Sequence, residues 1–104
     1  MDNYELHFNP DSQELAISVN ESKFDAASVS EFRRVVDEFW NPETLRVAID
    51  FSEVDFIDSS GIGALLSIHK RLQHAGNPVE IHHAKPNVVS VIELLRLHNI
   101  FYLK

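Results

Sequence analysis

The chain contains no cysteine, only three glycines, and far fewer basic than acidic residues. The absence of cysteine excludes disulfides, thiolate zinc sites and a cysteine nucleophile, and it fits a reducing compartment. The formal charge of −7 argues against a nucleic-acid partner, because affinity for nucleic acid comes largely from Lys and Arg neutralising phosphates. An acidic chain is better suited to a basic or mixed protein surface.

Long hydrophobic runs are missing as well. No segment resembles a membrane span, and the N-terminus lacks the basic-then-apolar pattern of a secretion signal. We therefore expect a cytoplasmic protein with no membrane partner. The 104 residues, 44 % of them apolar, suffice for one hydrophobic core, so we expect a single domain over residues 1–104.

Five segments have the character of β-strands. Alternating apolar and polar side chains mark the first two, and the turn residues between them predict a hairpin. The third is rich in β-branched residues and suits a central strand buried on both faces, whereas the last is an edge strand or a packed tail. In chain order the segments are residues 4–8, 15–19, 45–51, 79–83 and 100–103.

Three segments have the three-and-four spacing of apolar residues that is typical of amphipathic helices. We expect Asp25 to cap the first, which ends before Pro42. The second runs from an Asp-Ser-Ser-Gly turn to a Gly76 C-cap. The third is expected to begin at an Asn87 cap and to close at Asn99 in the left-handed conformation. Its apolar face would comprise Val88, Val91, Ile92, Leu94, Leu95 and Leu97.

The resulting order, β-β-α-β-α-β-α-β, predicts an α/β domain with a mixed sheet of four or five strands, right-handed crossovers and three helices. In such sheets, functional residues gather in the loops that follow the carboxyl ends of the strands. Three loops qualify, namely the loop around Asp25, the turn at residues 58–61 and the segment 83–86.

The turn Asp58-Ser59-Ser60-Gly61 places two hydroxyls at a helix N-terminus, with Asp58 or Ser59 as the N-cap. The unpaired N–H groups and partial positive charge of a helix start can hold a phosphate. Gly61 and Gly63 would leave backbone uncovered for the close approach of a partner. The alternatives are that the turn is only a cap and that Gly63 serves helix packing.

Residues 47–66, which contain this turn, are similar to the core signature of bacterial STAS domains, the anti-sigma factor antagonist family. The resemblance implies that Ser60, or less favourably Ser59, is phosphorylated by a partner kinase. It also implies partner switching, in which the unphosphorylated domain binds a regulator and phosphorylation releases it. The expected partner-binding residues are Asp25, Asp58, Ser59, Ser60, Gly61, Ile62 and Gly63.

The partners implied by this resemblance are an anti-sigma factor or a serine kinase with a histidine-kinase-like ATPase (HATPase) fold, together with a PP2C-type serine phosphatase. A second hypothesis keeps the same phosphorylation switch but assigns it to a scaffold that regulates a secretion, biofilm or signalling enzyme. A third, a small-molecule or nucleotide-binding STAS domain, is disfavoured because the chain lacks a Gly-rich phosphate loop.

The chain departs from the family pattern at two places. Ser22 stands where the family often has a glycine, which affects the shape of the loop before Asp25. The sequence stops at Lys104, where many members continue into a further helix, and we expect this either to expose the third helix or to leave a surface for a partner or a second copy. Whether the chain is a monomer or a dimer is left open.

Other residues give weaker signals. His82 and His83 are adjacent in a strand and point to opposite faces, and His69 and His74 are five residues apart on a helix, so neither pair suits a metal. No base is evident beside Ser60, so we expect no catalysis and no cofactor. Trp40 is expected to anchor the core or its rim. The charged residues Glu31, Arg33, Arg34, Lys70 and Arg71 are interpreted as solvated helix faces.

Overall fold

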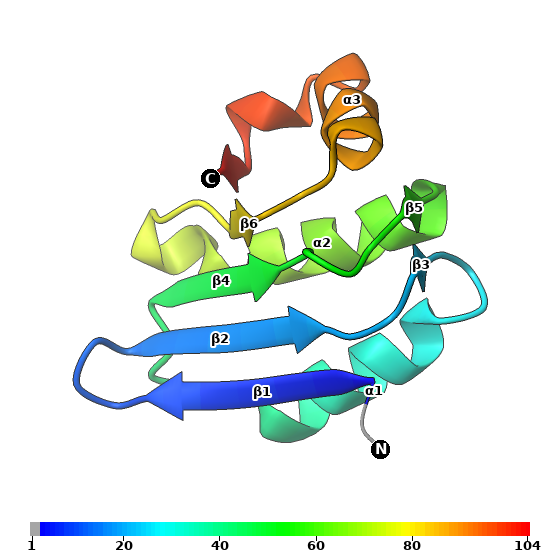
Figure 1. The fold of residues 1–104 in the computed structure, drawn as a ribbon. Helices are drawn as coiled ribbons and strands as arrows, with labels where there is room; N and C mark the ends of the chain where they lie inside the picture. The colour runs from blue at the N-terminus through cyan, green and yellow to red at the C-terminus, as the bar shows by residue number, and fades with distance from the viewer. Residues whose placement is uncertain (1–2) are drawn as a thin grey trace.

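The fold was obtained as a computed structural model, which describes residues 3–104. Its main sheet has five strands in the order β1-β2-β4-β6-β7 (Figure 1). β1 runs antiparallel to β2, and the remaining neighbours are parallel. The predicted hairpin, the mixed sheet and the final edge strand are therefore confirmed. The strands are β1 (Tyr4–Asn9), β2 (Glu14–Val19), β4 (Arg46–Asp50), β6 (Glu80–His82) and β7 (Tyr102–Leu103).

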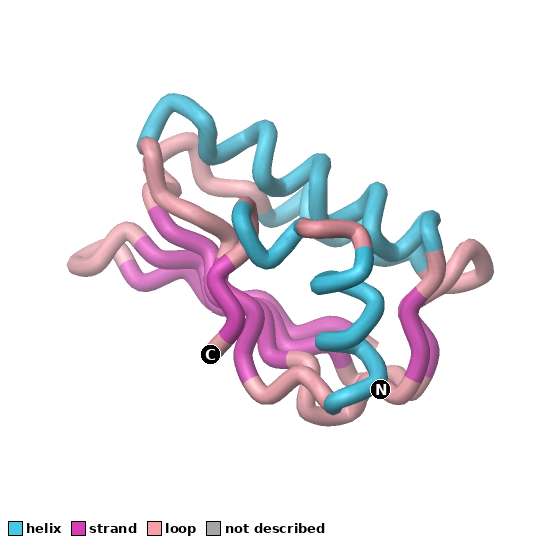
Figure 2. The backbone as a smooth tube through the Cα atoms, turned by 90° about the horizontal axis from the view of Figure 1, so that it is seen from above, coloured by secondary structure: helices cyan, strands magenta, loops and turns pink. Residues whose placement is uncertain are grey.

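The three predicted helices are α1 (Val29–Phe39), α2 (Ser59–Leu72) and α3 (Pro86–Leu94). A 3-10 turn (Gln73–Ala75) extends α2 and ends at Gly76, whose φ of 72° is the left-handed conformation expected of a glycine C-cap. Seen from above, α1 and α2 lie on one side of the strands (Figure 2). The domain thus has two layers, with α1 and α2 against one face of the sheet.

Two short strands, β3 (Lys23–Phe24) and β5 (Phe56–Ile57), form a separate parallel pair. Each has two residues, too few to produce an alternating pattern, and the sequence did not predict them. Because β3 precedes α1 and β5 precedes α2, the pairing of β3 with β5 holds the N-terminal ends of these two helices side by side.

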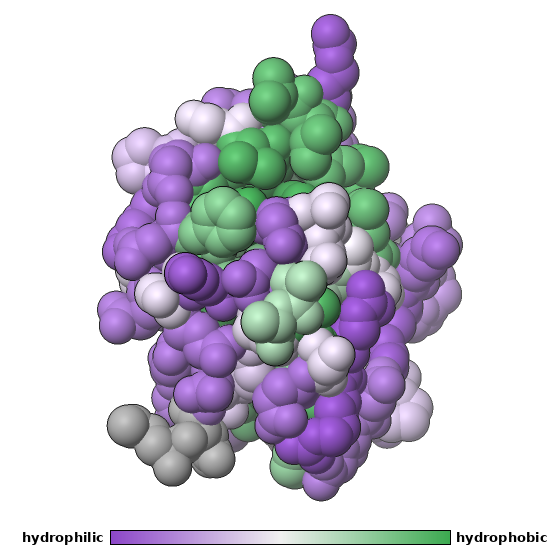
Figure 3. Space-filling view, turned by 90° about the vertical axis from the view of Figure 1, so that its right-hand side faces the viewer, coloured by the Kyte–Doolittle hydropathy of each residue, from purple (hydrophilic) through white to green (hydrophobic). Residues whose placement is uncertain are grey.

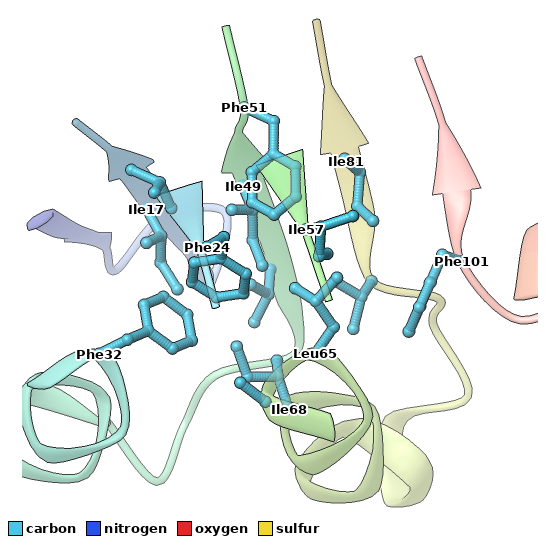
Figure 4. Close-up of a cluster of buried hydrophobic side chains, with 14 of the residues drawn as sticks. Ile17, Phe24, Phe32, Ile49, Phe51, Ile57, Leu65, Ile68, Ile81 and Phe101 are labelled. Atoms are coloured by element: carbon cyan, nitrogen blue, oxygen red, sulfur yellow. The ribbon is translucent and has the colours of Figure 1, made fainter. Parts of the chain in front are cut away.

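The hydrophobic core fills the space between the sheet and the two helices (Figure 4). Ile17 and Ile49 point from the sheet toward the helices, and Leu65 and Ile68 of α2 face them. Phe24 of β3 is fully buried in this core. Its ring meets that of Phe32 edge to face at 4.8 Å and that of Phe51 at 5.4 Å.

The prediction that the central strand is buried on both faces is wrong. Val47 and Ile49 of β4 are fully buried, but Arg46 is exposed and Ala48 and Asp50 are only partly covered. The reason is that α1 and α2 lie on the same side of the sheet, so no helix within residues 3–104 covers the opposite face of β4.

Two predicted helix caps are also corrected. Asp25 precedes α1 by a full turn. Its side chain accepts a hydrogen bond from the N–H of Ala27, and Ser28 is the N-cap. α3 starts one residue before Asn87, because Pro86 occupies the first helical position, where its missing N–H costs nothing, and Lys85 is the N-cap.

The end of α3 also differs from the prediction. The helix stops at Leu94, and the left-handed residue is Arg96, with a φ of 60°. Asn99 lies in the 3-10 turn that follows (Leu97–Asn99). The chain then turns back to pair β7 with β6.

Candidate functional site

The three loops singled out in the sequence meet at one edge of the molecule, where the starts of α1, α2 and α3 converge (Figure 1). The β3–β5 pair joins the first loop to the second. Lys85, at the start of α3, forms an ion pair with Asp55, and the Asn87 amide donates a hydrogen bond to the Asp55 carbonyl. The structure thus joins the first two loops through the β3–β5 pair and places the third loop against Asp55, just before β5.

Asp58 holds this edge together. As predicted, it is the N-cap of α2, and its Oδ1 accepts a hydrogen bond from the Gly61 N–H at 3.0 Å. Its Oδ2 accepts a second bond from the Ala26 N–H at 3.2 Å, which links the loop before α1 to the start of α2. The backbone N–H of Gly61, with further help from those of Ala26 and Ser60, lowers the pKa of the Asp58 carboxyl below its usual range.

This arrangement changes the predicted role of the helix start. The backbone N–H groups that were expected to receive a phosphate already face the Asp58 carboxylate. A phosphate on either serine would therefore lie beside a negative charge and would need a cation from elsewhere to offset it.

Ser59 and Ser60 occupy the first turn of α2. Ser59 is exposed and Ser60 is partly exposed. Neither hydroxyl is sealed in the core, so both are open to a modifying enzyme, and the choice of Ser60 stays a prediction.

Gly61 and Ile62, predicted as partner-binding residues, are buried. A Cβ at Gly61 would come within 2.8 Å of the Ile57 side chain and 2.9 Å of the Phe24 ring, and closer still to the Phe24 carbonyl oxygen. The expectation that Gly61 leaves its backbone uncovered is thus wrong, because β3 covers it. Gly61 and Ile62 support the turn from beneath, whereas Gly63 is partly exposed.

A second row of contacts connects α1 to α2 beyond Gly63. Arg33 Nη1 donates to Ser67 Oγ at 2.6 Å, and Arg71 forms an ion pair with Asp37. The Arg71 guanidinium also lies 5.0 Å from the centre of the Trp40 ring, which is partly buried as expected of a rim anchor. Arg33 and Arg71 are therefore inter-helix contacts and more than a solvated face.

Exposed hydrophobic side chains lie on β5 and at the end of α3. Phe56 of β5 is 49 % exposed, and at the end of α3 Leu94 is 83 % and Leu95 50 % exposed. β5 and α3 are in contact, and the space-filling view of this edge shows hydrophobic surface gathered over α3 (Figure 3). The prediction that Leu94 and Leu95 belong to the buried face of the third helix is wrong, because the helix ends at this point.

The histidines do not converge. Among residues 3–104, no group of three His, Asp or Glu side chains has the arrangement of a metal site. His82 Nε2 lies 3.0 Å from Glu80, and His83 Nδ1 lies 3.5 Å from Asp50. In the same part of the chain, no helix has the length and apolar character needed to cross a membrane.

The fold and this edge define a small α/β domain with a serine pair at the start of its second helix. A model of the STAS domain matches residues 10–104, and the chain belongs to that family. A comparison of the sequence with curated proteins gave no match.

Solved structures support the fold. An anti-sigma-factor antagonist (STAS) domain protein from Planctomyces limnophilus has a TM-score of 0.84 at 18 % identity, covering 100 % of this chain and 90 % of that one. A candidate anti-sigma factor antagonist from Thermotoga maritima has a TM-score of 0.76 at 22 % identity, covering 96 % and 84 %. The phosphorylated form of the Bacillus cell fate determinant SpoIIAA has a TM-score of 0.70 at 17 % identity, covering 97 % and 90 %.

Proposed function

We propose that this protein is an anti-sigma factor antagonist whose docking edge is switched by phosphorylation of Ser60. The unphosphorylated form would bind an anti-sigma factor or a HATPase-type serine kinase, and a PP2C-type phosphatase would restore it after phosphorylation. Membership of the STAS family and the likeness to SpoIIAA, solved in a phosphorylated form, support this proposal. The role is one of binding, and we assign no catalytic residue. As a regulator of transcription, the protein would act in the cytoplasm.

The observation that carries the proposal is the placement of the serine pair directly after β5, whose Phe56 is exposed and which contacts α3. Ser59 and Ser60 start α2 directly after β5, which contributes Phe56, and α3 contributes Leu94 and Leu95. An exposed hydrophobic patch next to polar groups is the usual character of a protein-binding surface. A partner docked there would cover the hydroxyl.

The same placement explains how a phosphate would release the partner. Phosphorylation adds about −1.5 to −2 charges at neutral pH. These charges would be added next to the Asp58 carboxylate, in an interface that loses water when the partner docks. Burying such a charge without a matching cation is costly, so binding would be lost while the domain stays folded.

The test compares partner capture by Ser60→Ala, Ser60→Asp and wild-type protein in a lysate of the native host, followed by mass spectrometry and phosphosite mapping. We expect an anti-sigma factor or ATPase-type kinase to be retained by wild-type and Ser60→Ala baits and lost by Ser60→Asp. Ser12→Asp is the matched control, because Ser12 is exposed in the β1–β2 turn, at the opposite end of the sheet (Figure 1).

Equal capture by the Ala and Asp baits, with no phosphate on Ser60, would overturn the switch. Capture of a secretion, biofilm or signalling enzyme in the same phosphorylation-dependent manner would support the switch but favour the scaffold hypothesis over sigma control.

A further inference from the structure

Arg33 of α1 reaches across to the face of α2 that begins with Ser60. Its Nη1 donates to Ser67 Oγ at 2.6 Å, and its Nη2 would lie 3.4 Å from a Cβ built at Gly63. Residues 60, 63 and 67 follow the helical spacing that places side chains on one stripe of a helix. The guanidinium therefore covers the stripe of which Ser60 is the first member.

Helical spacing sets how far the Arg33 guanidinium would have to move to meet a group on Ser60. Neighbours three residues apart on a helix have Cβ atoms about 5–6 Å apart, so position 60 is one helical turn from the position that Arg33 now covers. Side chains on a helix lean toward its N-terminus. α1 and α2 both start at the β3–β5 edge, so a guanidinium that leans toward the start of α1 moves toward Ser60 (Figure 1).

The present partner of Arg33 is weak. Ser67 Oγ is a neutral acceptor that itself donates to the Gly63 carbonyl at 3.1 Å. Within residues 3–104, Arg33 forms no ion pair with a carboxylate, whereas Arg34 pairs with Glu31 and Glu38, and Arg71 with Asp37. Lys85, the cation of the third loop, is paired with Asp55. Arg33 is thus a cation, without a carboxylate partner among these residues, that lies beside the stripe formed by residues 60, 63 and 67.

A phosphate at Ser60 would need such a cation. Asp58 already faces the N–H groups at the start of α2 and adds a negative charge of its own. A phosphate is a far better acceptor for a guanidinium than a hydroxyl is, because the hydrogen bonds are charge-assisted and can form in pairs.

We infer that, when Ser60 carries a phosphate, Arg33 leaves Ser67 and pairs with that phosphate, linking α1 to the start of α2. The inference rests on the proposed phosphorylation of Ser60 and adds a second residue to the switch. Arg33 would be a positioning residue that holds the phosphate against the domain. In the phosphorylated form, α1 would then contact the phosphate through Arg33.

The test uses protein carrying phosphoserine at position 60, introduced during translation so that no native kinase is needed. Phosphorus NMR then follows the second ionisation of the phosphate in the wild-type chain, in Arg33→Gln and in Arg34→Gln. We expect the Arg33→Gln phosphate to titrate at a pH higher by roughly half a unit or more, because the neighbouring cation that favours the dianion is gone. Arg33→Lys should recover part of the difference.

Arg34→Gln is the matched control. It is the same substitution on the same helix, but Arg34 lies beside Glu31, Glu38 and Tyr4 on the side of α1 that faces β1. Its phosphate should titrate as in the wild type. Arg33 is exposed, so its replacement is expected to leave the fold intact, and circular dichroism checks this.

Identical titration in the wild-type and Arg33→Gln chains would overturn the inference, as would an effect of Arg34→Gln equal to that of Arg33→Gln. The same phosphorylated protein is tested for binding to the captured partner. If the phosphorylated protein still binds the partner, the proposed switch fails even where Arg33 pairs with the phosphate. If the phosphorylated protein does not bind but the phosphates of the wild-type and Arg33→Gln chains titrate alike, the switch stands without Arg33.

Discussion

Gly61 and Gly63 lie two residues apart in α2, yet a side chain would meet different surroundings at each. At Gly61 the added Cβ would collide with the backbone of Phe24 and with Ile57, both buried parts of the β3–β5 pair. At Gly63 it would meet only the end of the Arg33 side chain, at 3.4 Å, which is an ordinary contact. The sequence could not predict this difference between the two glycines, because helical spacing does not reveal that a two-residue strand, β3, covers Gly61.

The two glycines give opposite predictions for stability. Gly61→Ala is expected to lower the free energy of unfolding by about 1–3 kcal/mol or more, because neither the Phe24 carbonyl nor the Ile57 side chain can move freely. Gly63→Ala is expected to raise it by about 0.5–1 kcal/mol, because alanine favours the helix and clashes with nothing. Urea unfolding followed by circular dichroism measures both values. A neutral Gly61→Ala would mean that β3 does not cover this turn.

At the scale of elements, the sequence predicted the elements that show a pattern in their residues. The strands of the hairpin alternate, the three helices have helical spacing, and the central strand is rich in β-branched residues. β3 and β5 have two residues each, and only the fold shows that they pair. The early start of α3 was readable from Pro86 at its first position, but the Asn87 side chain, expected to be a cap, binds the Asp55 carbonyl instead.

The end of α3 also carries a prediction about binding. Leu94 is 83 % exposed, so Leu94→Lys is expected to change the free energy of unfolding by less than about 0.5 kcal/mol. It places a charge in the proposed docking surface, so we expect it to weaken capture of the partner by tenfold or more, at least about 1.4 kcal/mol.

Phe39→Lys is the control for this change. Phe39 is 58 % exposed, but it ends α1 beside Tyr4 and Leu6 of β1, away from the serine pair. Calorimetric titration of the captured partner with each variant measures the affinity, and Phe39→Lys should leave it unchanged. Equal losses for the two variants would show that the α3 end is not part of the docking surface.

On the scale of the whole molecule, the layer arrangement decides which predictions failed. With α1 and α2 on one side, the main strands bury alternate residues. The sequence of β4 already showed this alternation, since Arg46 and Asp50 alternate with Val47 and Ile49. The three loops lie toward one edge because parallel strands deliver their carboxyl ends to the same edge whatever the loops contain. The contacts within that edge, above all the bond from Ala26 to Asp58, depend on tertiary geometry.

That bond predicts how the stability of the domain depends on pH. Hydrogen bonds lower the pKa of Asp58, so its contribution is fully present above the unfolded value of about 3.9 and is lost as the pH falls through the folded value. Asp58→Asn keeps one acceptor oxygen but does not titrate. The stability difference between wild type and Asp58→Asn should therefore be greatest near neutral pH and shrink below about pH 4.

Urea unfolding of both proteins at several pH values between about 3 and 7 measures this difference. The comparison cancels the repulsion among the other acidic residues, which the two chains share. A difference that stays constant over this range would show that Asp58 does not titrate with folding.

The cover that β3 places over Gly61 has a consequence for how the serine pair is recognised. A free peptide with the sequence of residues 58–63 would lack the Phe24 carbonyl above Gly61 and the Ala26 N–H on Asp58, the two contacts that fix the turn. An enzyme that acts on this turn therefore meets a shape that only the folded chain provides. Transferring the switch to another protein would require residues 23–26, which form β3 and the start of the following loop, to be transferred together with the serines.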